Sequence, residues 1–243
     1  MLTHADVLRA RRRITPYLPA TPLEPAPALG ANVWLKLENA NPTHSFKIRG
    51  ALNAVLSLSS DERARGLVTS SSGNHAQGLA YAAALAGAHA VILMPTHTPR
   101  RKVEGVLRHG AEVVLFADTY DACEAEAHRR ARDEGLKFIS PYNDLSVMAG
   151  AGTIGLEILE SLTDVERIVV CVSGGGLISG VATAVKGLAS ERVEVIGVNA
   201  LSAPSMYNFF YNQSLPENWD TLAEALSGGI EHGALTLDIV RHT

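Results

Sequence analysis

Residues 66–95 read GLVTSSSGNHAQGLAYAAALAGAHAVILMP, and this stretch decides the fold class. The apolar runs at 67–69 and 90–95 have the length of buried strands. The alanine-rich run between them has the length of a helix and ends at Gly87, where a glycine favours the close of a helix. A strand, a helix and a second strand in this order predict two parallel strands joined by a right-handed crossover.

Strand and helix patterns alternate on both sides of this stretch. Further strands are predicted at 33–37, 111–116, 136–140, 167–172 and 193–198. Short apolar strands separated by helices indicate parallel sheets that are covered on both faces. The sequence therefore predicts an α/β fold.

Composition excludes several classes of protein. The chain has 243 residues, is 47% hydrophobic and carries a net charge of −4, so one large domain or two small ones are expected. The basic run at 9–13 is interpreted as a solvated helix face, not a nucleic-acid site. Cys123 and Cys171 form neither a disulfide framework nor a metal cluster. Without a signal core or an apolar run of about 18 residues, the sequence predicts a soluble cytoplasmic protein with no membrane partner.

A single lysine stands out in the stretch 39–50, NANPTHSFKIRG. Lys47 follows Phe46 at the start of a predicted helix, which Ser45 or Thr43 is placed to cap. Desolvation and the positive end of the helix dipole would both lower its pKa. A lysine of lowered pKa suits Schiff-base chemistry, but a surface lysine in the first turn of a helix is also consistent with this stretch.

The loop Ser70–His75, SSSGNH, lies between a predicted strand and a predicted helix. Its free backbone N–H groups at a helix N-terminus suit an anion such as a carboxylate. Asn74 can donate a hydrogen bond to an oxygen of a ring-bound ligand. A well-capped helix without a ligand explains the same residues equally well.

The loop Ser173–Leu177, SGGGL, lies between the next apolar strand and its helix. Consecutive glycines allow the backbone to approach a phosphate closely, so a merely flexible turn is disfavoured. The dinucleotide pattern GxGxxG is not met, because Ser179 stands where the third glycine is needed and the following strand ends in Asn199, not in an acidic residue. No GK[ST] follows, so a Walker loop is excluded.

A Schiff-base lysine, a carboxylate loop and a phosphate loop together indicate pyridoxal phosphate. In this interpretation Lys47 holds the aldehyde of the cofactor. The glycine loop holds its phosphate, and the SSSGNH loop receives the carboxylate of the substrate.

The motifs SFKIRGA, SSGNHAQG and SGGGLISG, in this order and spacing, resemble those of the fold-type II pyridoxal-phosphate enzymes. They are most similar to the serine/threonine dehydratase family, which also contains serine racemases and hydroxyaspartate dehydratases. The resemblance covers residues from about 5 to 243. It implies two open, mainly parallel, twisted sheets with flanking helices, similar to the tryptophan synthase β subunit.

The resemblance also implies roles for individual residues. Lys47 would hold the cofactor and then move the α-proton, and Ser72 would act on the opposite face of the α-carbon in a racemase. The cofactor would further contact Phe46, Asn74, Ser173, Gly174, Gly175, Gly176 and Leu177. The substrate would contact Ser71, Ser72, Gly73, Asn74 and His75.

A division into two domains follows from the same resemblance. The large, discontinuous cofactor-binding domain would comprise 1–52 and 146–243, and the small mobile domain would comprise 53–145. Closure of the small domain would bring Ser72 to Asn74 onto the substrate. The resemblance further implies a homodimer.

The chain departs from the family pattern at several places, and three of them bear on ligands or on completeness. Ser173 replaces the first of four glycines and could donate its hydroxyl to the phosphate. Asn199 stands where some members have a metal-binding glutamate, so no metal is expected. The family continues past a segment like 222–230 with further strands and a partner for the pyridine nitrogen, so the end of this chain is expected to be truncated.

The predicted function is an ammonia-lyase of amino-acid metabolism that removes water and ammonia from L-serine or L-threonine. A serine racemase, or a dehydratase of another β-hydroxy amino acid such as hydroxyaspartate, shares the motifs and stays open. An inactive chain that still binds cofactor or a partner also stays open.

Overall fold

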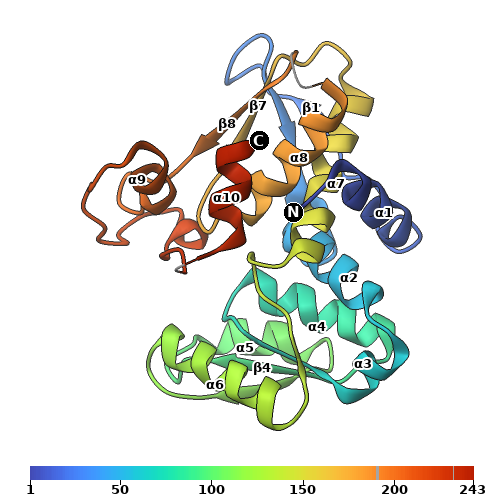
Figure 1. The fold of residues 1–243 in the computed structure, drawn as a ribbon, viewed down its shortest axis with the longest axis vertical. Coiled ribbons are helices and arrows are strands. Elements are labelled where there is room, and N and C mark those ends of the chain that lie inside the picture. The colour runs from blue at the N-terminus through green and yellow to red at the C-terminus, as the bar shows by residue number, and fades with distance from the viewer. Residues whose placement is uncertain (190–191, 232) are drawn as a thin grey trace. The chain divides into compact units, whose positions relative to one another are not determined.

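The computed structural model describes residues 1–189, 192–231 and 233–243 (Figure 1). The chain forms two compact units. The terminal unit contains residues 1–11 and 142–243, and the middle unit contains residues 12–141.

The middle unit contains most of the predicted strand–helix alternation. Its elements are β1 (Leu23–Pro25), β2 (Trp34–Lys36), the 3-10 helix Glu38–Ala40, α2 (Lys47–Ser57), α3 (Ser60–Arg65), β3 (Leu67–Ser70), α4 (Asn74–Ala86), β4 (Ala90–Met94), α5 (Arg100–Leu107), β5 (Glu112–Leu115), α6 (Tyr120–Asp133) and β6 (Lys137–Phe138).

Four parallel strands form the sheet of the middle unit, in the order β5-β4-β3-β6. The chain crosses from β3 to β4 to β5 in one direction and from β5 to β6 in the other. Right-handed crossovers therefore place α4 and α5 on one face and α6 on the other. The two central strands are buried along their whole length, as expected for a parallel sheet covered on both faces. The predicted α/β class is confirmed.

The helix that begins at Lys47 packs against α4. A Cβ on Gly78 of α4 would lie 3.2 Å from the backbone nitrogen of Ile48, so glycine permits this close approach. The middle unit thus includes α2 and runs from residue 12 to residue 141. The division into a small domain at 53–145 and a large domain at 1–52 and 146–243 stays a prediction.

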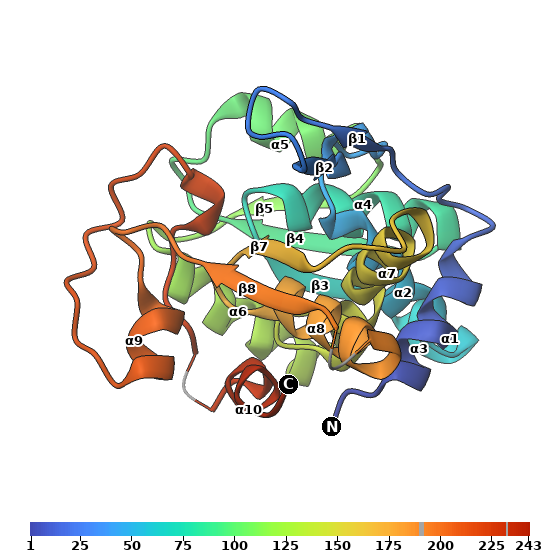
Figure 2. The same ribbon diagram turned by 90° about the horizontal axis from the view of Figure 1, so that it is seen from above.

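The terminal unit is built from the two ends of the sequence. Its elements are α1 (His4–Ile14), which runs on past the unit boundary, α7 (Leu145–Ser161), β7 (Arg167–Cys171), α8 (Gly176–Ala189), β8 (Glu194–Val198), α9 (Ser205–Tyr211), the 3-10 helix Glu224–Leu226 and α10 (Leu235–His242). Figure 2 shows β7 and β8 side by side, and they pair in parallel.

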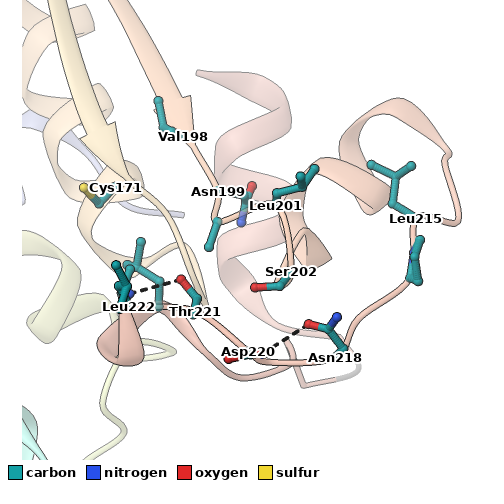
Figure 3. Close-up of a pocket in the computed structure, with 14 residues that line it drawn as sticks. Cys171, Val198, Asn199, Leu201, Ser202, Leu215, Asn218, Asp220, Thr221 and Leu222 are labelled. Atoms are coloured by element: carbon teal, nitrogen blue, oxygen red, sulfur yellow. Dashed lines mark hydrogen bonds between the residues drawn. The ribbon is translucent and has the colours of Figure 1, made fainter.

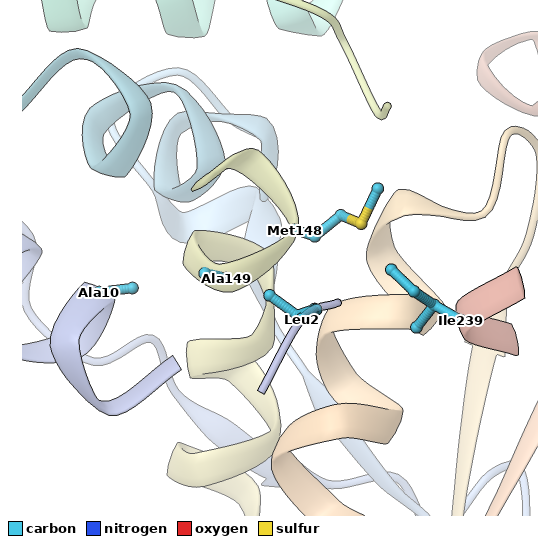
Figure 4. Close-up of a cluster of buried hydrophobic side chains, with 5 residues drawn as sticks. All are labelled: Leu2, Ala10, Met148, Ala149 and Ile239. Carbon is cyan, nitrogen blue, oxygen red and sulfur yellow. The ribbon is translucent and has the colours of Figure 1, made fainter. Parts of the chain in front are cut away.

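Two helices of the terminal unit cross at small residues. A Cβ on Gly180 of α8 would overlap the carbonyl oxygen of Met148 in α7, so the two backbones are in contact at this point. Beside the crossing, Leu2 and Ala10 pack with Met148, Ala149 and Ile239 in one buried apolar cluster (Figure 4). The cluster joins the start of the chain to α7 and α10.

One local prediction is wrong, and two short elements were not predicted. Phe46 is the cap residue of α2 and makes no side-chain cap, although Ser45 Oγ accepts a hydrogen bond from Lys47 N at 3.3 Å. Strand β1, which pairs antiparallel with β2, was not predicted as a strand. Helix α3 was not predicted, although its capping box, Ser59 with Glu62, is visible in the sequence. No helix in the described part of the chain is long and apolar enough to cross a membrane.

Candidate functional site

Lys47 is the first residue of α2. Its Nζ donates a hydrogen bond to the carbonyl oxygen of Pro141 at 2.8 Å and lies 5.2 Å from the centroid of the Phe46 ring. Burial lowers the pKa of Lys47 to about 8. A neutral amine is the form that attacks a carbonyl group, so this pKa makes Lys47 a competent nucleophile close to neutral pH.

A buried ion pair closes the turn that carries Lys47. The guanidinium of Arg49 binds both carboxylate oxygens of Glu38, with Nε 2.7 Å from Oε2 and Nη2 2.9 Å from Oε1. The Arg49 side chain is 1% exposed and that of Glu38 is 16% exposed. Thr21 Oγ1 and Asn41 Nδ2 also donate to this carboxylate. The chain on either side of Lys47 is therefore held by paired and hydrogen-bonded charges.

The predicted carboxylate loop joins β3 to α4. Asn74 is the first residue of α4 and is exposed, and Ser71 Oγ accepts a hydrogen bond from the backbone N–H of Gly73. Ser72 and Gly73 are partly exposed. The hydroxyl of Ser70 is buried and has no hydrogen-bond partner within the described chain. The loop thus presents a helix N-terminus with polar side chains, an arrangement that suits an anion.

His75 differs from the rest of this loop, because its ring is buried. Its Nε2 lies 3.2 Å from the carbonyl oxygen of Ile139, so this nitrogen carries the hydrogen. Burial, and secondly the charge of Lys47, lower the pKa of His75 to about 3. The imidazole is therefore neutral at physiological pH. The predicted contact of His75 with substrate stays a prediction, and the buried ring leaves the backbone N–H to make it.

A short segment after β6 connects these groups. Thr69 Oγ1 and His75 Nε2 both bond the carbonyl oxygen of Ile139, and Lys47 Nζ bonds that of Pro141. The middle unit therefore brings Lys47 and the start of α4 together around one strand end. The sequence gives no signal for the part played by Pro141, because a backbone carbonyl is present in every residue.

The predicted phosphate loop lies in the terminal unit, between β7 and α8, and is enclosed by side chains. A Cβ on Gly174 would lie 2.7 Å from the ring of Tyr142, and one on Gly176 would lie 2.9 Å from the Tyr142 carbonyl oxygen. Gly175 has φ +86°, and its Cβ would lie 2.5 Å from Cε of Met206. Gly174 and Gly176 are needed here for space, and Gly175 is needed for its backbone conformation.

Two hydroxyls beside the glycine loop are buried without partners within the described residues: Ser179 Oγ and Thr236 Oγ1. Ser179 N donates to the carbonyl oxygen of Gly175 at 3.0 Å, and Thr236 Oγ1 lies 3.3 Å from the position of a Cβ on Gly175. Buried hydroxyls normally have a hydrogen-bond partner. Orphaned hydroxyls at a glycine loop and a helix N-terminus fit a bound phosphate.

The predicted site residues thus form two groups. Phe46, Lys47 and the loop Ser70–His75 belong to the middle unit, and the loop Ser173–Leu177 belongs to the terminal unit. The first group supplies an amine of lowered pKa and the second a cradle for an anion, so the donor set fits pyridoxal phosphate. Within the described ranges, no three His, Cys, Asp or Glu side chains are grouped to hold a metal ion.

Comparison with known proteins gives a consistent result. The family described as pyridoxal-phosphate dependent enzyme matches residues 12–243. The L-threonine ammonia-lyase of Thermotoga maritima is 45% identical over 210 residues, which are 85% of this chain and 52% of the relative. The catabolic L-threonine dehydratase of Staphylococcus aureus is 38% identical over 98% of this chain and 70% of the relative.

A solved structure extends the comparison to the fold. Maize serine racemase matches with a TM-score of 0.92 and 31% identity, over 99% of this chain and 74% of that one. The predicted fold type is therefore confirmed. The chain spans 52–74% of the lengths of these three relatives.

Proposed function

The chain belongs to the family of pyridoxal-phosphate-dependent enzymes, and we propose that it is a lyase that converts L-threonine or L-serine to 2-oxobutyrate or pyruvate and ammonia. The threonine ammonia-lyase and threonine dehydratase relatives support this activity. The observation that carries the proposal is the amine of Lys47, which burial holds at a pKa of about 8. An amine with this pKa can both attach to an aldehyde and exchange a proton near neutral pH.

The proposed contacts with the cofactor fall into two groups. Lys47 Nζ would attach to the cofactor aldehyde, with Phe46 beside the ring and Asn74 bonded to the ring hydroxyl. The backbone N–H groups of the loop Ser173–Leu177 would hold the phosphate. The hydroxyls of Ser179 and Thr236, which are buried beside this loop, would gain the partner that they lack.

Lys47 would also move the proton. When bound, the cofactor withdraws electrons from the α-carbon of the amino acid. With the amino acid bound in its place, the free Nζ of Lys47 would accept the α-proton. The hydrogen bond to the Pro141 carbonyl oxygen gives the freed amine a resting position within the middle unit.

The loop at the start of α4 would orient the substrate. The N-terminus of a 13-residue helix favours the negative carboxylate of an amino acid. Ser71, Ser72, Gly73, Asn74 and the backbone of His75 would contact it. Loss of the β-hydroxyl as water would leave an unsaturated amine, and uptake of one water by its imine form would release a keto acid and ammonia.

A racemase is the second candidate, because serine racemases share the fold and about a third of the sequence. In that case Ser72 would supply or accept the proton on the face of the α-carbon opposite Lys47. A dehydratase of hydroxyaspartate would use the same residues with a different β-substituent. We also propose, on the family resemblance alone, a homodimer located in the cytoplasm. Light scattering of the purified chain would show whether its mass is that of a monomer or of a dimer.

Substrate profiling tests the proposed activity. The purified chain with added pyridoxal phosphate is incubated with L-threonine, L-serine and hydroxyaspartate, and keto acid, ammonia and D-amino acid are measured. The proposal predicts keto acid and ammonia in equal amounts from L-threonine or L-serine, and none from Lys47→Ala. A D-amino acid without keto acid would assign the racemase instead, and unchanged turnover in Lys47→Ala would refute both.

A further inference from the structure

Asn199 lies outside the three sequence motifs, and its side chain links two segments of the terminal unit by hydrogen bonds. It directly follows β8, and Figure 3 shows it between the end of that strand and the turn at Leu201 and Ser202. Its Nδ2 donates to the carbonyl oxygen of Val172 at 3.1 Å and to that of Ala203 at 3.3 Å. One amide nitrogen has two hydrogens, so a single side chain can satisfy both carbonyls.

The first of these contacts fixes the start of the glycine loop. Val172 is 2% exposed and directly precedes Ser173. Its backbone N–H donates to the carbonyl oxygen of Val198 at 2.8 Å, while its own carbonyl accepts from Asn199. Both backbone polar groups of Val172 are therefore held by the last residue of β8 and the residue that follows it.

The second contact holds the segment that leads into α9, whose Met206 packs against the same loop. Ala203 is 1% exposed and lies just before α9, which begins at Ser205. The next residue in that helix, Met206, places its Cε 2.5 Å from the position of a Cβ on Gly175. Asn199 thus ties the segment that carries this methionine to the strand end that carries the glycine loop.

We infer that Asn199 is a positioning residue for the phosphate of pyridoxal phosphate, acting through the loop Ser173–Leu177. The inference rests on the proposed function, which assigns the phosphate to this loop. Without these hydrogen bonds, the carbonyl groups of Val172 and Ala203 would each lose one partner. The glycine loop and Met206 could then move apart. Anion binding by backbone N–H groups needs all of them to point at one place.

A pair of ligands isolates this effect. Pyridoxal carries the aldehyde and lacks the phosphate, so it reports on Lys47 but not on the glycine loop. The affinities of both ligands are measured by the absorbance of the bound form, and their ratio is the preference for phosphate. The variants are Asn199→Asp, which keeps the shape but has no donors, and Asn199→Ser, which is neutral and too short to reach both carbonyls.

The matched control is Asn208→Asp. Asn208 also donates from Nδ2 to a backbone carbonyl in the terminal unit, that of Leu215 at 2.9 Å. No residue of the glycine loop is among its hydrogen-bond partners in the described part of the chain. Its substitution should leave the preference for pyridoxal phosphate at the wild-type ratio.

The expected result is a preference reduced about tenfold in both Asn199 variants, which is the size of one or two lost hydrogen bonds, with pyridoxal affinity unchanged. Pyridoxal binding also shows that each variant is folded. A reduction in Asn199→Asp alone would mean charge repulsion and would overturn the inference, as would a wild-type ratio in both. If wild-type protein itself shows no preference for pyridoxal phosphate, the proposed phosphate loop is wrong.

Discussion

Lys47 Nζ lies 2.8 Å from the carbonyl oxygen of Pro141, at the end of the segment whose Ile139 carbonyl also accepts from Thr69 and His75. One strand end thus holds a lysine amine of lowered pKa next to a buried neutral imidazole. The two groups respond to pH in different ranges, and each response can be measured.

Lys47 should make stability depend on pH in alkaline solution. The pKa of Lys47 is about 8 in the folded chain, whereas the ordinary pKa of a lysine is 10.5. Between these values the unfolded chain binds a proton that the folded chain lacks, so the free energy of unfolding should rise with pH through this range. Urea unfolding of the cofactor-free chain at several pH values would show the slope, and Lys47→Met should lose that component. An identical slope in the variant would contradict the lowered pKa.

His75 should make the middle unit sensitive to acid. The pKa of His75 is about 3 in the folded chain, whereas the ordinary pKa of a histidine is 6.5. As pH falls from 6.5 toward 3, the unfolded chain gains a proton that the folded chain does not, so the free energy of unfolding should fall. His75→Gln keeps a donor for the Ile139 carbonyl and should unfold with a weaker dependence on acid. His97→Gln, at an exposed position, controls for the loss of an imidazole.

The Arg49–Glu38 pair should contribute strongly to stability. Arg49→Met leaves a carboxylate that is 16% exposed without its main partner, which should lower the free energy of unfolding by about 3–5 kcal/mol. Arg100→Met breaks an exposed pair with Glu104 in the same unit and should cost less than about 1 kcal/mol. Chemical denaturation would measure the free energy of unfolding of both variants. Equal losses would show that burial of the pair adds nothing.

Gly175→Ala should disturb the glycine loop more than its backbone conformation alone explains. Gly110→Ala is a matched control, because Gly110 has a similar φ of +78° with open space around its Cβ position, and it should cost about 1–2 kcal/mol. At Gly175 the methyl group would also meet Met206, adding about 1–3 kcal/mol. Affinity for pyridoxal phosphate should fall only in Gly175→Ala. If both variants bind pyridoxal phosphate with the same affinity, this loop does not bind the cofactor.

The sequence predicts the parts of this molecule that depend on local pattern. Alternating strands and helices predicted the α/β class, and the C-terminal cap of α4 at Gly87 lies where residue type places it. The proposed lysine is at the start of its helix, as predicted. Each of these features depends on neighbours within a few residues.

Features made by residues distant in the sequence could not be predicted. Tyr142 and Met206 enclose the glycine loop from segments on either side of it, and the hydrogen bond from Asn199 to Val172 requires the paired strands β7 and β8. The buried ring of His75 is another such case, because its partner is Ile139.

The central claim is that Lys47 holds pyridoxal phosphate, and one spectrum tests it most directly. The visible absorbance of the purified chain with added cofactor is recorded before and after borohydride, beside Lys47→Ala. The account predicts a band that borohydride bleaches, with the cofactor then fixed on the peptide that contains Lys47, and no such band in the variant. A band of equal strength in Lys47→Ala, or cofactor fixed on another lysine, would contradict it.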